Sequence, residues 1–505
     1  MLETPTRLRL PAKWVGSSLW AQLGDALGYE DLKVKHEWRT WRDVQRKDDA
    51  YQQSPSYRPH WFVAKYGREA LDAKVAALEA ERHKSLLFRD EQGFWTYSGL
   101  ATRLKDMTGE PVVLGYPRPA PGLVGWHSTP HEPRWYQQRA EELLVPMGHG
   151  AVELATGLGK SLIIARLLWR LGLPGIVVAP TLSIAGQLHA DLVRLFGRQH
   201  VGQFFDGKKQ ADKKFVVAVS KSLINLEPGT PLAEALARKA VLIGDESHLL
   251  PAETLARVVL GLLGNVPYRF FLSGTQLRSD GLDLLLEGIT GDIVLRMNVR
   301  QGVDEGFLTR PRFFQFQVQS DRNYDVPDPI KMNRVHLHDN PKVYEHAGGL
   351  IRHALRAGRR PLVLVEEVPQ FGRLLPFLGG VKAGFAHGGV NKDNRDSIPK
   401  AHHKSDPMAL VEAFDAGELE CLVGTQCIGT GTDIKTASFV VDLVGLASEV
   451  RIRQNVGRGT RVHPTKKDFI YVDYDVRNFE GLSRQAAKRA RIFDDIYGPV
   501  KYLKA

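Results

Sequence analysis

The chain has 505 residues, enough for three or four domains of roughly 150 residues each, so a small disulfide-stapled module is excluded. Hydrophobic residues make up 43% of the sequence and charged residues 25%, a balance typical of a folded globular protein and not of a disordered one. Lysine and arginine number 68 against 57 aspartates and glutamates, and the net charge of +11 is compatible with a polyanionic partner.

The N-terminal region, residues 1–128, is rich in tryptophan: eight of the nine tryptophans lie before residue 136. Residues 66–84 have apolar side chains at helical spacing and residues 93–100 read as a short aromatic strand, which together predict a small α+β domain. The proline-rich residues 116–121 are typical of a linker. The aromatic side chains have two interpretations, base stacking beside nearby lysines and arginines, or packing in a core.

Two later regions alternate apolar runs with amphipathic helices. Short Val- and Ile-rich runs are typical of strands buried on both faces of a parallel sheet. The sequence therefore predicts two tandem α/β domains, residues 129–305 and 306–480, followed by a basic C-terminal tail, residues 481–505. The predicted strands are 175–179, 215–220, 241–244 and 270–273 in the first domain, and 361–365, 421–424, 439–443 and 469–472 in the second.

The segment ATGLGKS, residues 155–161, lies between an apolar run and a helix-like segment. Small residues let backbone N–H groups wrap a triphosphate at a helix N-terminus. Lys160 can neutralise the β- and γ-phosphates, and Ser161 can ligate Mg²⁺. We therefore predict a phosphate-binding loop in which Thr156, Gly157 and Gly159 also contact the nucleotide.

Asp245 and Glu246 follow the apolar run AVLIG, at the expected carboxyl end of a strand, where open α/β sheets bind ligands. Asp245 can hold Mg²⁺ through its hydration shell, while Glu246 takes a proton from the attacking water. A solvated acidic turn is the alternative interpretation. The position after a phosphate loop and a buried strand favours the catalytic one.

The segment RQNVGRGTR, near the end of the second α/β region, contains Gln454, Arg458 and Arg461. Guanidinium groups delivered across a cleft can stabilise charge that develops on a γ-phosphate, and they arrive only when two domains close. The alternatives for such arginines are a solvated helix face or a nucleic-acid contact.

In this order and spacing, the segments resemble the motifs of superfamily 2 helicases and nucleic-acid translocases, whose fold is two tandem RecA-like parallel-sheet domains. ATGLGKS resembles motif I, DESH at residues 245–248 resembles motif II, and QNVGRGTR resembles motif VI. The likeness extends to RWYQ at residues 134–137, to APTLSIAGQ at 179–187 (motif Ia), to SGT at 273–275 (motif III) and to GTQCIGTGTDI at 424–434 (motif V).

This resemblance implies an enzyme that hydrolyses ATP with Mg²⁺ and binds nucleic acid. It implies that Arg134 and Gln137 contact the nucleotide, with Gln137 reading adenine, and that Gly431 and Asp433 also contact it. By the same resemblance, hydrolysis is coupled to domain movement through His248, Ser273 and Thr275. The nucleic-acid contacts that it implies are Pro180, Thr181, Gln187, Ser220, Thr425 and Thr430.

Within the superfamily, the N-terminal module, the compact motor and the phrase HEPRWYQQRAEELL at residues 131–144 look most similar to the UvsW type of phage recombination helicase. That resemblance implies ATP-driven unwinding or branch migration of forks, D-loops and junctions in recombination, repair or replication, with the N-terminal domain gripping the DNA. Three alternatives stay open: an RNA helicase, the motor part of a restriction system and, from another class, a non-hydrolysing nucleotide-switched nucleic-acid-binding protein.

Cysteine usage and hydropathy indicate the compartment. Cys421 and Cys427 have neither zinc-like spacing nor a disulfide framework, which suits a reducing cytoplasm. Residues 1–14 lack the apolar segment of a signal peptide, and the most hydrophobic window, residues 161–180, is interrupted by two arginines. We expect a cytoplasmic protein, in the host cytoplasm if it is phage-encoded. We also expect it to act as a monomer, without a membrane, and to meet recombination or replication proteins.

Overall fold

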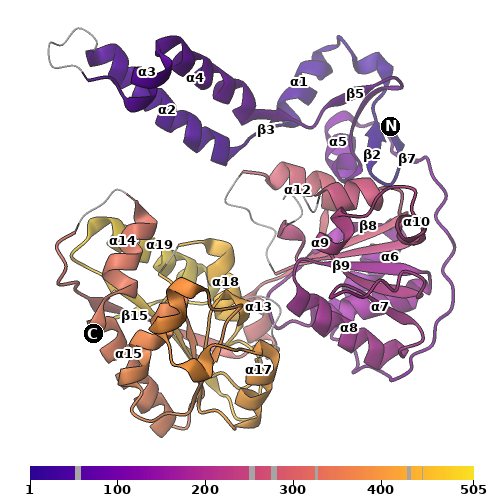
Figure 1. The fold of residues 1–505 in the computed structure, drawn as a ribbon. Helices are drawn as coiled ribbons and strands as arrows, with labels where there is room; N and C mark the ends of the chain where they lie inside the picture. The colour runs from indigo at the N-terminus through magenta and orange to yellow at the C-terminus, as the bar shows by residue number, and fades with distance from the viewer. Residues whose placement is uncertain (52–57, 250–255, 275–280, 325–327, 429–433, 446) are drawn as a thin grey trace.

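The computed structural model describes residues 1–51, 58–249, 256–274, 281–324, 328–428, 434–445 and 447–505. Figure 1 shows an N-terminal region and two sheet domains that follow one another along the chain. Both sheets are seven-stranded and, in every described pairing, parallel, so the predicted fold class of two tandem RecA-like domains is confirmed. In the described residues, no helix is both long and apolar enough to cross a membrane.

The first sheet has the strand order β10-β11-β9-β12-β13-β8-β14. Its inner strand β9 is apolar throughout because Val177 and Ala179 face one core cluster while Ile176 and Val178 face another. The strands are β8 (His149–Leu154), β9 (Gly175–Ala179), β10 (Val201–Phe204), β11 (Phe215–Val219), β12 (Val241–Asp245), β13 (Tyr268–Ser273) and β14 (Ile293–Met297). The helices are α6 (Trp135–Met147), α7 (Lys160–Leu171), α8 (Leu182–Phe196), α9 (Ser220–Ile224), α10 (Pro231–Ala237) and α12 (Asp283–Thr290).

The second sheet has the strand order β17-β18-β16-β19-β20-β15-β21. Strand β16 also alternates between two cores, with Leu362 and Leu364 on one face and Val363 on the other. The strands are β15 (Arg310–Val318), β16 (Pro361–Leu364), β17 (Ala383–Ala386), β18 (Cys421–Gly424), β19 (Phe439–Asp442), β20 (Asp468–Val476) and β21 (Lys501–Lys504). The helices are α13 (Val299–Asp304), α14 (Pro329–Asn333), α15 (Pro341–Arg356), α16 (Val368–Leu374), α17 (Pro407–Ala416), α18 (Glu449–Gly457) and α19 (Glu480–Ile496).

The C-terminal residues differ from the expected basic tail. Helix α19 packs on the second sheet, and β21 pairs in parallel with β15 at its edge. The basic side chain of Arg489 is 4% exposed and donates to both carboxylate oxygens of Asp473 at 3.0 Å. A positive charge in this segment therefore neutralises a buried carboxylate of the sheet.

The N-terminal region combines a five-stranded sheet of order β5-β6-β2-β1-β7 with helices, as predicted for an α+β domain. Its sheet strands are β1 (Leu2–Glu3), β2 (Arg7–Arg9), β5 (Phe88–Asp90), β6 (Gly93–Tyr97) and β7 (Val113–Leu114), and helices α1 (Ser18–Ala26) and α5 (Ala101–Thr108) accompany them. A second part is a helical hairpin on the strand pair β3 (Gly28–Glu30) and β4 (His83–Ser85), made of α2 (Leu32–Tyr51), α3 (Trp61–Tyr66) and α4 (Arg68–Arg82).

The N-terminal region is fixed to the first sheet domain through α12. Arg103 forms a bidentate hydrogen bond with Glu287 at 2.8 and 2.6 Å. Gly99 lies so close that an added Cβ would be 2.3 Å from the carbonyl oxygen of Glu287, so only glycine fits there. The predicted linker, residues 116–121, leads into a segment that lies along the same domain, where Trp126 stacks on Trp169 at 5.3 Å.

Candidate nucleotide site between the two sheet domains

The predicted phosphate loop joins β8 to α7. Gly157 and Gly159 have φ values of 99° and 79°, which a residue with a side chain rarely adopts. Helix α7 begins at Lys160, so the free N–H groups of its first turn lie beside the loop. This arrangement suits an anion such as a triphosphate.

Gln137 hydrogen-bonds the phosphate loop from outside the cavity. Its amide nitrogen donates to the carbonyl oxygens of Leu158 at 3.0 Å and Gly159 at 3.3 Å. Its amide oxygen accepts from the backbone N–H of Arg134 at 2.9 Å, and the side chain is only 3% exposed. Both ends of the amide are therefore occupied, and neither Gln137 nor Arg134 lines the cavity at the loop. Adenine recognition by Gln137 stays a prediction, and it would require these bonds to break.

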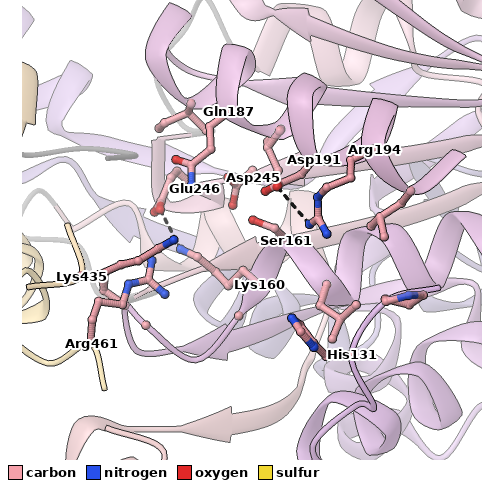
Figure 2. A pocket seen from close by; sticks show the side chains of 18 of the residues that line it. His131, Lys160, Ser161, Gln187, Asp191, Arg194, Asp245, Glu246, Lys435 and Arg461 are labelled. Atoms are coloured by element: carbon pink, nitrogen blue, oxygen red, sulfur yellow. Dashed lines mark hydrogen bonds and ion pairs between the residues drawn. The ribbon is translucent and has the colours of Figure 1, made fainter. Parts of the chain in front are cut away.

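Asp245 is the last residue of β12, and Glu246 follows in the left-handed region with φ 52°. That conformation is uncommon for a residue with a side chain and is strained. Nζ of Lys160 lies 2.6 Å from Oε1 of Glu246, and both side chains are largely buried (Figure 2). The phosphate-loop lysine and the predicted catalytic carboxylate are thus paired with each other.

The two carboxyl groups differ in acidity. Burial raises the pKa of Asp245 to about 6; the neighbouring Glu246 also raises it, whereas Lys160 lowers it. Burial also opposes ionisation of Glu246, but the charges of Lys160, His248 and Arg458 together outweigh it and hold the pKa of Glu246 below its usual value. Glu246 is therefore the more firmly ionised of the pair.

The donor set suits a hydrated magnesium ion. Oδ1 of Asp245 is buried and has no hydrogen-bond partner in the described part of the chain. Ser161 lies in the same cavity as Asp245, so a hydroxyl and a carboxylate oxygen face one space. Carboxylate and hydroxyl oxygens are ligands that Mg²⁺ accepts.

The second sheet domain supplies the other wall of the cavity, from α18 and the residues after it. Oγ1 of Thr460 donates to the carbonyl oxygen of Thr156 at 3.3 Å, so this segment touches the phosphate loop directly. The resulting cavity, of about 420 Å³, brings together Lys160, Ser161, Asp245, Glu246, Gln454, Arg458 and Arg461. Residues predicted from three distant segments therefore share one space.

Some residues of this cavity were not predicted for it. Gln187, expected to contact nucleic acid, lines this cavity, and its contact with nucleic acid stays a prediction. Asp191 and Arg194, 3.4 Å apart, lie on the same face of α8, and His131 lines the cavity from the segment before α6 (Figure 2). The spacing of three and four residues from 187 to 194 is the signal that could have grouped these α8 side chains.

Two of the three predicted coupling residues lie next to each other. Nδ1 of His248 lies 2.8 Å from Oγ of Ser273 and 3.4 Å from Oε2 of Glu246. His248 is 5% exposed and Ser273 is fully buried. Thr275 lies outside the described residues, and the coupling role of the pair stays a prediction.

The other predicted nucleic-acid residues lie at carboxyl ends of strands. Pro180 and Thr181 follow β9, Ser220 follows β11, and Thr425 follows β18 of the second sheet. Thr181 caps α8, because its hydroxyl accepts from the N–H of Ile184 at 3.4 Å. Thr430, Gly431 and Asp433 lie outside the described residues. Nucleic-acid contacts by this group stay a prediction.

Comparisons with known protein families agree with this arrangement. Residues 130–278 match the family model described as Type III restriction enzyme, res subunit, and residues 342–463 match the Helicase conserved C-terminal domain. The two matches fall on the two sheet domains, and each domain contributes residues to the shared cavity.

Individual relatives are distant. The ATP-dependent DNA helicase uvsW of Enterobacteria phage T4 is 20% identical over 70% of this chain and 70% of its own length. The ATP-dependent DNA helicase RecG of Acidithiobacillus ferridurans is 24% identical over 66% of this chain and 54% of its own. Matches to these two and to four other relatives span between 20% and 79% of the relatives' lengths. Among solved structures, S. cerevisiae Dbp5 bound to RNA and ADP BeF3 shares the fold, with a TM-score of 0.53 and 15% identity over 74% of this chain and 90% of that one.

Proposed function

The chain belongs to the superfamily 2 helicases, enzymes that hydrolyse ATP, and we propose that it uses this hydrolysis to move along DNA and to remodel branched DNA. The observation that carries the proposal is the cavity in which Lys160 and Glu246 of the first sheet domain meet Arg458 and Arg461 of the second. A site built from both domains makes turnover depend on how they are placed relative to each other.

Binding of a triphosphate would rearrange the Lys160–Glu246 pair. The γ-phosphate is the stronger partner for the Lys160 ammonium, so Lys160 would turn from Glu246 to the phosphates. Glu246 would then be free to orient water and accept its proton. Asp245 and Ser161 would hold Mg²⁺, which neutralises phosphate charge when bound.

The arginines of the second domain would complete the site. Arg458 and Arg461 line the same cavity as Lys160 and can stabilise charge on the γ-phosphate. Because they belong to the other sheet domain, ATP would favour the closed arrangement and product release would loosen it. Alternating closure of two domains that each grip a nucleic-acid backbone would give stepwise movement.

DNA as the substrate is supported by the relatives, since uvsW and RecG are both named as ATP-dependent DNA helicases. The net charge of +11 suits a polyanion of either kind. The similarity to uvsW over 70% of the chain supports recombination-type substrates such as forks, D-loops and four-way junctions.

The test is ATP hydrolysis by the wild-type chain and by Glu246→Gln, with single-stranded DNA, duplex DNA, a four-way DNA junction and duplex RNA at one salt concentration. We expect the strongest stimulation with the junction and loss of hydrolysis in the variant. Stimulation by RNA alone would contradict the proposal. The fixed salt concentration matters because backbone contacts weaken steeply with salt for any nucleic acid.

A second candidate is the motor part of a restriction system. The family model that matches residues 130–278 is that of a restriction-enzyme subunit, which favours it. A motor of this kind would travel on unbranched duplex DNA. Equal stimulation by linear duplex and junction, with displacement of a third strand from the linear duplex, would therefore favour this function over branch remodelling.

A further inference from the structure

The helical hairpin of the N-terminal region projects from the rest of that region as an arm (Figure 1). Its base is the antiparallel pair β3 and β4, and the backbone N–H of Asp31 donates to the carbonyl oxygen of Arg82 where the two helices begin and end. At a rise of about 1.5 Å per residue, α2 places the far end of the arm roughly 30 Å from this base.

An ion-pair network joins the two long helices of the arm. The guanidinium of Arg68 binds Asp48 at 2.8 Å, Asp49 at 2.6 Å and Asp72 at 2.9 Å, which ties α4 to α2. Asp48 is 3% exposed, and these partners raise the pKa of Arg68 although partial burial opposes the shift. Because this network joins α4 to α2 through Arg68, it fixes the two helices relative to each other.

Five aromatic rings gather where α3 packs beside the middle of α2, and we refer to them as the aromatic cluster: Trp41, His60, Trp61, Phe62 and Tyr66. The inner rings pack together, with Trp41 and Phe62 at 4.9 Å. The outer two are largely open to solvent, because Trp61 is 61% exposed and Tyr66 is 53% exposed. A clustered, exposed tryptophan and tyrosine mark a contact surface more often than isolated apolar side chains do.

Two lysines lie against the aromatic cluster. Nζ of Lys65 lies 4.9 Å from the ring of Tyr66, and Nζ of Lys74 lies 4.8 Å from the ring of Trp41. Arg46 and Lys47 of α2 have exposed side chains and share the single carboxylate of Asp43. Over residues 32–82 the arm carries eleven lysines and arginines against eight aspartates and glutamates.

Flat apolar rings bordered by cations match the chemistry of a nucleic-acid strand, which presents planar bases beside phosphates. A nucleic-acid strand with an exposed base therefore matches both the rings and the cations of the arm.

We propose that the aromatic cluster stacks on a base exposed at a branch point or in an unpaired strand of DNA, with Trp61 and Tyr66 as the stacking rings. The proposal rests on the proposed function and adds to it the place and the kind of contact that the N-terminal region makes. The arm would hold the branch while the two sheet domains move along the backbone.

The experiment uses the full chain and a DNA fork that carries 2-aminopurine at the junction, whose fluorescence falls when a ring stacks on it. We expect the wild type to quench the probe, and the Trp61→Ala, Tyr66→Ala double variant to lose the quenching. Its affinity for the fork should fall by about five-fold or more, since loss of one stacked base has at least that effect.

Three controls keep the result specific. Trp61→Phe retains a ring and should keep most of the quenching. Tyr502→Ala removes a tyrosine that is 54% exposed on β21 and should change nothing. Hydrolysis of ATP with single-stranded DNA that is too short to reach the arm should stay within two-fold of the wild type in all variants.

The outcomes separate the two proposals. A wild type that remodels forks and a double variant that quenches and binds as well as the wild type would overturn the stacking contact alone. A wild type whose hydrolysis no DNA stimulates would overturn the proposed function and this inference together. A double variant that binds the fork more weakly yet quenches the probe fully at saturating protein would also overturn stacking, because the cluster would then hold DNA without touching the base.

Discussion

Nδ1 of His248 lies 2.8 Å from Oγ of Ser273, so the segment after β12 is hydrogen-bonded to the last residue of β13. The same ring nitrogen lies 3.4 Å from Glu246, which is itself paired with Lys160 of the phosphate loop. A triphosphate that draws Lys160 away from Glu246 would therefore change the surroundings of His248 and, through it, of β13. This is a physical route from the nucleotide to the rest of the first sheet domain.

Breaking that route should separate hydrolysis from movement. In Ser273→Ala, we expect ATP hydrolysis to stay within about three-fold of the wild type, while fork remodelling per ATP falls by about five-fold or more, the size of a modest coupling free energy. The measurement is the ratio of strand displacement to phosphate release. Ser483→Ala removes a serine hydrogen bond to Asp475 elsewhere and should leave the ratio unchanged.

Lys160→Met should have two separable effects. Hydrolysis should fall by about 10²- to 10³-fold, because a charge that stabilises the transferred phosphoryl group is lost. The folded state should also lose about 3 kcal/mol, because Glu246 keeps a buried charge without its partner. Denaturation of the double variant Lys160→Met, Glu246→Gln checks the second effect: its stability should recover while hydrolysis stays absent.

Arg461→Ala should leave nucleotide affinity within a few-fold of the wild type and reduce the hydrolysis rate by about 10³-fold or more, as expected of an arginine that acts on the transition state. Single-turnover hydrolysis and binding of a fluorescent nucleotide measure the two quantities. Arg453→Ala is the matched control, since Arg453 lies on α18 and pairs with Glu449 outside the cavity. Unchanged hydrolysis in Arg461→Ala would refute its role.

Gln137→Ala should weaken the binding of ATP and GTP equally, by about five- to ten-fold, because the variant loosens the phosphate loop that both nucleotides use. Competition binding with the two nucleotides gives the ratio of their affinities. A ratio that shifts toward GTP would instead show that the amide leaves Leu158 and Gly159 to read adenine.

Acid should destabilise the first sheet domain through His149. Burial, and to a smaller extent the nearby Arg269, lower the pKa of this imidazole to about 3, whereas an unfolded histidine has a pKa near 6.5. Between these values the unfolded chain binds the extra proton, so stability falls as the pH falls from about 6.5 toward 3. In His149→Gln, urea unfolding at pH 7 and pH 4.5 should show a smaller loss on acidification.

The sequence was sufficient where a local pattern determined the structure. Apolar runs such as residues 175–179 and 241–244 are strands because both faces of a parallel sheet are buried. That requirement is visible in the residue types themselves. Strand β21 carries Lys501 and Lys504 and has no such run. It is formed by pairing with the distant strand β15, which no local pattern encodes.

The candidate site, too, could be predicted from the sequence only in part. Lys160, Glu246 and Arg461 could be grouped because their motifs follow one another in a fixed order. The hydrogen bonds that turn Gln137 toward the loop, and the position of Arg194 at the cavity, depend on how α6 and α8 pack against α7. Sequence spacing within one helix can suggest a shared face but not the neighbour that the face meets.

The strand order of the second sheet has a consequence for synthesis of the chain on the ribosome. Strand β15 comes first in that domain, yet its neighbours β20 and β21 come last, with Gln315 and Asp473 in register 158 residues apart. At about 5 to 20 residues per second, β15 waits roughly 10 to 30 seconds with both edges unpaired. Its aromatic side chains Phe313 and Phe316 are then uncovered, while the first sheet is already complete. The nascent chain is thus most prone to aggregate, and most in need of a chaperone, during translation of the second domain.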